Sequence, residues 1–169
     1  MDREYFENLI DKYSDILFRC AFSYCKNKSD AEDIVQETFI KYLRKKPNFN
    51  LDSEEKAWLL RVTINMSKDL LKTYWHKNRQ ELTDIPVEFN DNSFYIFTLI
   101  SKLPSKYRIV IHLYYQEGYK IKEISQILKL NTSTVGNRLA RAKKILKKYI
   151  EEENYEWLLY WWYSKNILR

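Results

Sequence analysis

The amino-acid sequence predicts an all-α protein of two small helical domains joined by a linker, the second domain containing a helix-turn-helix. Only two glycines and three prolines occur among the 169 residues, so the chain has little turn material and should be nearly all helix. The apolar fraction of 45% excludes a disordered chain. No run of about 18 uncharged apolar residues indicates a membrane span. The net charge of +6 is consistent with a polyanionic partner.

The first domain, residues 1–79, is expected to be a compact bundle of three helices with short connections. The second helix has acids at its start and bases at its end, which suits the helix dipole. Ser29 or Asp30 is predicted to cap it, and Leu43 is predicted to belong to its core-facing stripe. The three helices are expected over residues 3–25, 30–46 and 54–78, with a loop over 47–53.

A linker is predicted over residues 80–93, where four acids and a proline occur without a single base. The second domain follows over 94–150, with helices near 94–103 and 105–116 before the helix-turn-helix. Residues 151–169 form an aromatic tail that would be apolar nearly all round as a helix, so free exposure is not expected. The tail is expected to pack on the second domain, to bind a protein partner, or to touch a membrane transiently.

The helix-turn-helix is predicted over residues 119–149. Asn131 is expected to cap its second helix, and Val135, Leu139, Ala142 and Leu146 recur at helical spacing, so they should face the core. Six Lys or Arg and no acid occur between 134 and 150, a pattern typical of a helix that lies in the DNA major groove. A merely solvated face is the alternative. The face opposite the core is predicted to carry Thr134, Asn137, Arg138, Arg141, Lys144 and Lys148.

The third helix mixes bases with aromatic residues, a combination that suits single-stranded DNA because phosphates meet charge and unstacked bases meet flat rings. The aromatic residues are Trp58, Tyr74, Trp75 and His76. For Trp58 alone, a place in the core is the favoured interpretation. The polar residues predicted along one side of this helix are Arg61, Asn65, Lys68 and Lys72.

Catalysis and metal binding have little support in the sequence. His76 and His112 are isolated, no nucleophilic arrangement is recognisable, and the two glycines do not form a phosphate-binding loop. We therefore expect no enzyme and no cofactor. Cys20 and Cys25 are expected to be reduced, buried thiols, with a metal or disulfide role as the alternative. The N-terminus lacks the pattern of a secretory signal, which predicts a cytoplasmic protein.

Several blocks of the sequence together resemble the extracytoplasmic-function (ECF) family of bacterial RNA polymerase sigma factors. The blocks occur in the family's order and spacing and cover nearly all of residues 1–150. They include Trp58-Leu59, Asn65, Asp69 and Leu103-Pro104. In full they read SDAEDIVQETFIKYL, AWLLRVTINMSKDLLK, LPSKYRIVIHLYYQEGYKIKEISQILK and TVGNRLARAKKIL.

The resemblance implies roles for the surfaces of the first domain. The second helix would bind core RNA polymerase through Asp33, Gln36, Glu37 and Lys41; a solvated helix face is the alternative. The loop and third helix would read the promoter −10 element and hold a base flipped from the melting duplex. The implied −10 residues are Asn48, Phe49, Asn50, Arg61, Asn65, Lys68 and Lys72.

The resemblance also implies that the helix-turn-helix reads the −35 element through Thr134, Asn137, Arg138, Arg141 and Lys144. Expected partners are core RNA polymerase, promoter DNA as duplex and melted strand, and an anti-sigma factor, which in this family is often membrane-anchored. A stand-alone helix-turn-helix regulator is the main alternative function, and a protein-interaction adaptor is a third.

Three residues depart from the family pattern around the helix-turn-helix. Lys120 stands where a Ser-like cap is frequent, and Lys129 stands where glycine is common before the turn. Gly136 lies inside the second helix, where glycine costs about 1 kcal/mol relative to alanine. Gly136 either permits a close approach of the DNA backbone or marks a weakened helix.

Overall fold

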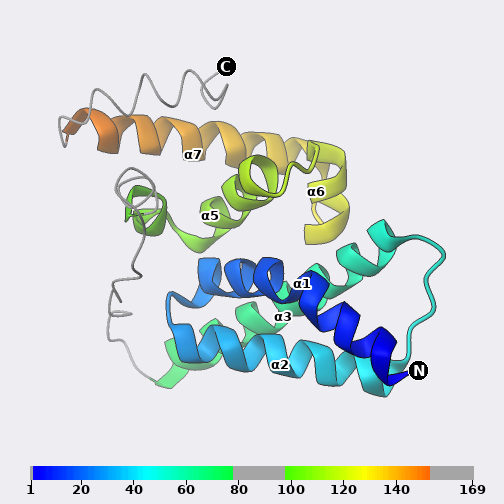
Figure 1. Cartoon of the computed structure of the whole chain (residues 1–169). Coiled ribbons are helices and arrows are strands. Elements are labelled where there is room, and N and C mark those ends of the chain that lie inside the picture. The colour runs from blue at the N-terminus through cyan, green and yellow to red at the C-terminus, as the bar shows by residue number, and fades with distance from the viewer. Residues whose placement is uncertain (1, 78–97, 153–169) are drawn as a thin grey trace. The chain divides into compact units, whose positions relative to one another are not determined.

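The computed structural model describes residues 2–77 and 98–152, and within these ranges the regular structure is entirely helical, which confirms the predicted fold class (Figure 1). The chain divides into two compact units, Met1–Ile85 and Pro86–Arg169. None of the helices in the described ranges has both the length and the apolar character needed to cross a membrane. The predicted linker over 80–93 and all but the first two residues of the tail lie outside the described residues.

The first unit is a three-helix bundle of α1 (Arg3–Cys25), α2 (Lys28–Lys45) and α3 (Asp52–Lys77), in which each helix packs against the other two. Leu17, Leu59 and Ile64 are among its fully buried residues. Both cysteines are buried thiols on α1. The loop between α2 and α3 spans residues 46–51, so the third helix begins two residues earlier than predicted.

Two predictions for α2 are wrong. Its cap is Asn27, not Ser29 or Asp30: the Asn27 side-chain oxygen accepts a hydrogen bond from the Asp30 backbone N–H at 3.1 Å, so the helix starts two residues earlier. Leu43 is 38% exposed and does not belong to the core. It lies one position beyond Tyr42, which is 1% exposed, at the edge of the apolar stripe.

The second unit contains a helical stretch over 98–102, α5 (Ser105–Ile111), a π-helical turn η1 (His112–Gln116), α6 (Ile121–Leu128) and α7 (Thr132–Glu152). The predicted helix over 105–116 therefore changes to π geometry in its last five residues. Buried Arg108 joins the first two segments, because its Nη1 donates hydrogen bonds of 2.7 Å to the carbonyls of Ser101 and Leu103. The core contains Leu99, Leu103, Ile109, Leu113, Ile124, Leu146 and Ile150.

Candidate nucleic-acid interface

The turn of the helix-turn-helix is fixed by backbone and side-chain hydrogen bonds. Helix α6 ends at Leu128 and is capped by Lys129, whose φ of 53° is left-handed, and the Leu130 N–H donates to the Ser125 carbonyl at 2.9 Å. Asn131 then caps α7 as predicted, accepting a hydrogen bond from the Thr134 N–H at 2.9 Å. The start of α6 has half of a capping box, since the Lys120 N–H donates to Glu123 at 2.7 Å.

Helix α7 has the two faces that the sequence predicts. Val135, Leu139, Ala142 and Leu146 are buried in the core of the second unit. On the other side Asn137, Arg141, Lys144 and Lys148 are exposed, while Thr134 and Arg138 are half-buried.

Two of the lysines late in α7 pair with acids at the end of the same helix. Lys147 lies 3.9 Å from Glu151, and Lys148 lies 3.4 Å from Glu152. The surface best suited to DNA is therefore the part of the helix before these pairs, with Arg138, Arg141 and Lys144.

Arg141 has a neighbour that the sequence did not reveal. Its guanidinium group interacts with the hydroxyl of Tyr107 on α5, and this interaction lowers the pKa of Tyr107 below its ordinary value of 10.0. This interaction connects Arg141, on the exposed side of α7, with the helix α5 that packs against α7. No local pattern announces it, because 34 positions separate the two residues in the sequence.

Gly136 on α7 is not required by packing within the protein. A Cβ at this position would come within 4 Å of no protein atom beyond its chain neighbours and the adjacent backbone of its own helix. Packing within the described protein therefore does not explain this glycine. It either leaves room for a binding partner such as DNA or marks a weak point in the helix.

The loop before α3 carries the three predicted strand-binding residues. Asn48 and Asn50 are exposed, and Phe49 is half-buried. The ring centroids of Phe49 and Trp58 lie 6.2 Å apart. The Asn50 backbone N–H donates a hydrogen bond to a Glu54 carboxylate oxygen at 3.2 Å. Trp58 also packs edge-on against Tyr42 at 5.7 Å, yet it stays half-buried, so this ring joins the core to the loop.

Helix α3 brings its predicted polar residues onto one side. Asn65 and Lys72 are exposed, and Arg61 and Lys68 are half-buried. Lys72 forms an exposed ion pair of 2.9 Å with Asp69. The side chains of Tyr74, Trp75 and His76 lie outside what the structure describes, so their predicted contact with a strand stays a prediction.

A shallow groove of about 410 Å³ lies between α2 and α3. Three apolar residues and four acids are among its lining residues, and two of the acids, Asp33 and Glu37, belong to the predicted polymerase-binding set. Gln36 and Lys41 are exposed on α2 but do not line the groove. The lining residues are Asp30, Asp33, Ile34, Glu37, Met66, Asp69, Leu70 and Thr73.

Sequence reasoning missed the contribution of α3 to this groove. Met66, Asp69 and Leu70 have ordinary spacing on their own helix, and only its pairing with α2 places them beside Asp33. It also missed the exposure of Ile40, which is 39% accessible and one turn from Gln36 on α2. Ile40 and Leu43 therefore add two exposed apolar side chains to α2, beyond the groove.

Comparison with known proteins gives the two units separate matches. Residues 9–77 match the model for Sigma-70 region 2, and residues 93–146 match the model for Sigma-70 region 4. The RNA polymerase sigma factor SigV of Bacillus subtilis (strain 168) is 31% identical over 144 residues, covering 81% of this chain and 86% of that protein. The ECF RNA polymerase sigma factor SigX of the same organism is 29% identical, covering 88% and 84%.

Two solved structures share the fold. One is the sigma factor RpoE in complex with the anti-sigma factor NepR from Bartonella quintana, with a TM-score of 0.73, 20% identity and coverage of 86% of this chain and 96% of that one. The other is CnrH in complex with the cytosolic domain of CnrY, with a TM-score of 0.65, 22% identity and coverage of 89% and 90%.

Proposed function

Because the chain belongs to the ECF group of sigma-70 family RNA polymerase sigma factors, we propose that its first domain binds core polymerase and reads the −10 element, while its second domain reads the −35 element. A protein of this family directs promoter-specific transcription initiation and is not an enzyme. The observation that carries the proposal is the presence of both regions in one chain, each with its own polar surface. A stand-alone helix-turn-helix regulator does not require the first domain.

The −35 reader is the part of α7 that precedes its two lysine–glutamate pairs. Exposed Arg141 and half-buried Arg138 are the best candidates for base contacts, since a bidentate arginine–guanine contact contributes about 1–3 kcal/mol of discrimination. Thr134 and Asn137 lie in the first two turns, where a recognition helix usually meets base edges. Lys144 is a candidate for phosphate contact, which positions the helix without specifying sequence.

The −10 reader is the loop 46–51 together with the polar side of α3. Asn48 and Asn50 offer hydrogen-bonding groups, and Phe49 offers a ring beside Trp58. Arg61, Asn65, Lys68 and Lys72 supply charge and polarity along the helix for a separated strand. Capture of a flipped base would favour the open duplex as well as read its sequence.

Core polymerase is proposed to bind the exposed face of α2. The acidic groove with Asp33 and Glu37 suits a partner that carries basic residues beside apolar ones. Gln36, Ile40 and Leu43 extend this face along the helix, and Lys41 adds a charge on its flank.

An anti-sigma factor is the proposed inhibitor, because the sigma factor RpoE, whose fold is similar, was solved in complex with the anti-sigma factor NepR. The protein would act in the cytoplasm, where polymerase and promoter DNA are, and a membrane-anchored inhibitor would reach it there. We propose that the aromatic tail takes part in this regulation and not in promoter choice. Deletion of residues 155–169 is expected to alter solubility or inhibition more than promoter preference.

Pulldown of core polymerase, followed by transcription from a promoter library, tests the proposed function. Promoter-specific transcripts should appear only when both core polymerase and this chain are present. Tight, specific binding to duplex DNA by the isolated chain, without core-dependent transcripts, would support the stand-alone regulator instead. No dependence on nucleic acid in any of these assays would support the adaptor.

A further inference from the structure

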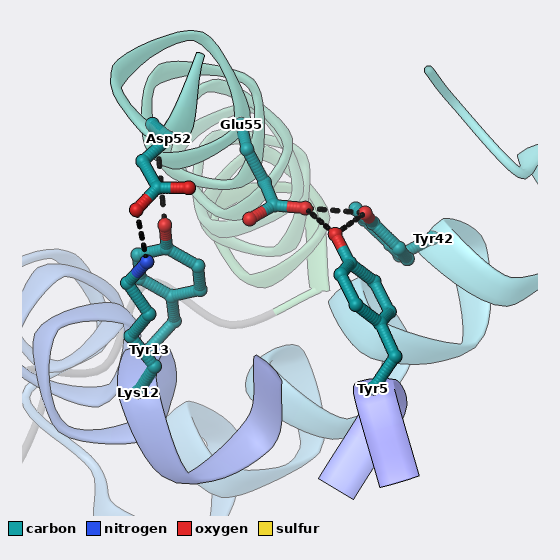
Figure 2. Close-up of polar contacts among 6 residues, drawn as sticks. All are labelled: Tyr5, Lys12, Tyr13, Tyr42, Asp52 and Glu55. Atoms are coloured by element: carbon teal, nitrogen blue, oxygen red, sulfur yellow. Dashed lines mark hydrogen bonds and ion pairs between the residues drawn. The ribbon is translucent and has the colours of Figure 1, made fainter. Parts of the chain in front are cut away.

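A buried acid joins all three helices of the first unit at the start of α3. Glu55 is 6% exposed, and one of its carboxylate oxygens accepts hydrogen bonds from Tyr5 on α1 at 2.6 Å and from Tyr42 on α2 at 2.5 Å (Figure 2). The two hydroxyls lie 3.2 Å apart. An acid buried without such donors would cost several kcal/mol, so the tyrosines are what make this position tolerable.

A second connection joins α1 to the same turn of α3. Lys12 forms an exposed ion pair of 2.5 Å with Asp52, and the Tyr13 hydroxyl lies 3.4 Å from the Asp52 carbonyl oxygen (Figure 2). The exposed ion pair alone contributes little. The position of the pair matters more than its energy. Together with Tyr5, it means that α1 contacts the first turn of α3 at two places along its length.

This first turn of α3 directly follows the loop 46–51, which carries the proposed −10 residues. The N–H groups of Glu54 and Glu55 donate to the Leu51 carbonyl, at 3.0 and 3.3 Å, and Tyr42 supports Trp58, which touches Phe49. The loop thus meets, at Phe49, a ring that packs on Tyr42 and, at Leu51, the backbone of the turn whose Glu55 side chain binds Tyr5 and Tyr42.

We propose that Tyr5, Tyr42 and Glu55, here called the tyrosine–glutamate clamp, are positioning residues that fix the loop 46–51 for capture of a −10 base. They would act through the loop and not by touching DNA. Hydrogen bonds suit this task because they fix direction, whereas apolar packing alone tolerates small shifts. The inference rests on the proposed −10 role of the loop.

The test compares Tyr42→Phe with Thr38→Val in holoenzyme assembled from the full chain and core polymerase. Tyr42→Phe keeps the ring against Trp58 and removes only the hydroxyl. Thr38→Val also removes a buried hydroxyl between α2 and α3. The Thr38 and Thr63 hydroxyl oxygens lie 3.1 Å apart, and the other partners of the Thr38 hydroxyl, Ile34 and Met66, also lie on these two helices and not on the loop. Thermal unfolding of both variants measures whether the two substitutions lower stability by similar amounts.

Strand opening is measured at a −10 element that contains a fluorescent base, beginning from duplex promoter. Tyr42→Phe should slow opening by roughly tenfold, whereas Thr38→Val should open the promoter at the wild-type rate. Both variants should bind core polymerase normally. A promoter already unpaired but unchanged in sequence at −10 should still bind Tyr42→Phe more weakly than wild type, because base capture itself is impaired.

Glu55→Gln supplies a second variant, since an amide oxygen can still accept from both tyrosines. It should open the promoter faster than Tyr42→Phe. Wild-type opening by Tyr42→Phe, or equal slowing by Thr38→Val, would overturn the positioning role. Failure of the wild-type holoenzyme to open any promoter would instead overturn the proposed function on which the inference rests.

Discussion

The side-chain oxygen of Asn131 lies 2.9 Å from the backbone nitrogen of Thr134 and accepts its hydrogen bond, which caps the helix proposed to read the −35 element. Replacing Asn131 with Ala should lower the free energy of unfolding of the second unit by about 1 kcal/mol, since the first turn of α7 loses an acceptor. Amide hydrogen exchange in that turn measures the loss. Asn131→Ser keeps an acceptor and should lose much less; equal losses would show that the cap contributes nothing.

Lys129 should be improved by glycine, because its backbone is left-handed and a side chain is unfavourable there. Lys129→Gly is expected to raise the free energy of unfolding by up to about 1 kcal/mol. Lys144→Gly is the matched control: this exposed lysine lies in the interior of α7, where the same change should cost about 1 kcal/mol. Two changes of the same sign in urea unfolding would contradict the conformational explanation.

Gly136→Ala should stabilise α7 by up to about 1 kcal/mol, because beyond its own helix backbone the added Cβ meets no protein atom within 4 Å. The reverse change at exposed Ala140 on the same helix should destabilise it by a similar amount. Binding of the holoenzyme to −35 DNA then separates the two explanations of this glycine. Weaker binding by the more stable variant indicates close approach of the DNA backbone, and unchanged binding indicates a weak point in the helix.

The buried face and the cap of α7 were predicted correctly from the sequence. The apolar repeat of α7 was enough to identify Val135 and Leu139 as core residues, and the Asn131 cap followed from its place in the turn. The choice among Asn27, Ser29 and Asp30 was harder, because all three residue types can cap a helix and they stand close together.

What depends on two helices could not be read from the sequence. Asp69 joins Asp33 in a groove only because α2 and α3 pair in one particular rotation. An acid in the first turn of a helix, such as Glu55, ordinarily suits the helix dipole in solvent. Its burial depends on tyrosines 50 and 13 positions earlier in the chain.

The first unit should lose stability in alkaline solution. Burial, together with hydrogen bonds to Glu55 and Tyr5, raises the pKa of Tyr42 well above its ordinary value of 10.0. Since the unfolded chain ionises first, this contribution is complete below pH 10.0 and declines as the pH rises from there toward the folded pKa. Calorimetric unfolding across this range should show a shallower decline for Tyr42→Phe.

The slope that one such tyrosine adds is at most about 1.4 kcal/mol per pH unit. Thr38→Val serves as the control, since it should lower the whole stability curve without changing its alkaline slope. An unchanged slope in Tyr42→Phe would mean that this hydroxyl does not keep its proton preferentially in the folded protein.

The most direct test of the two-reader proposal is transcription from a library randomised in both promoter elements, read separately for each position. Arg138→Ala and Arg141→Ala should relax preference in the −35 element only, by a factor of about 5 to 150, which corresponds to about 1–3 kcal/mol. Arg61→Ala and Asn65→Ala should relax preference in the −10 element only, and all four variants should bind core polymerase like wild type. Loss of preference in both elements from either pair, or reduced core binding in every variant, would contradict the assignment of one promoter element to each domain.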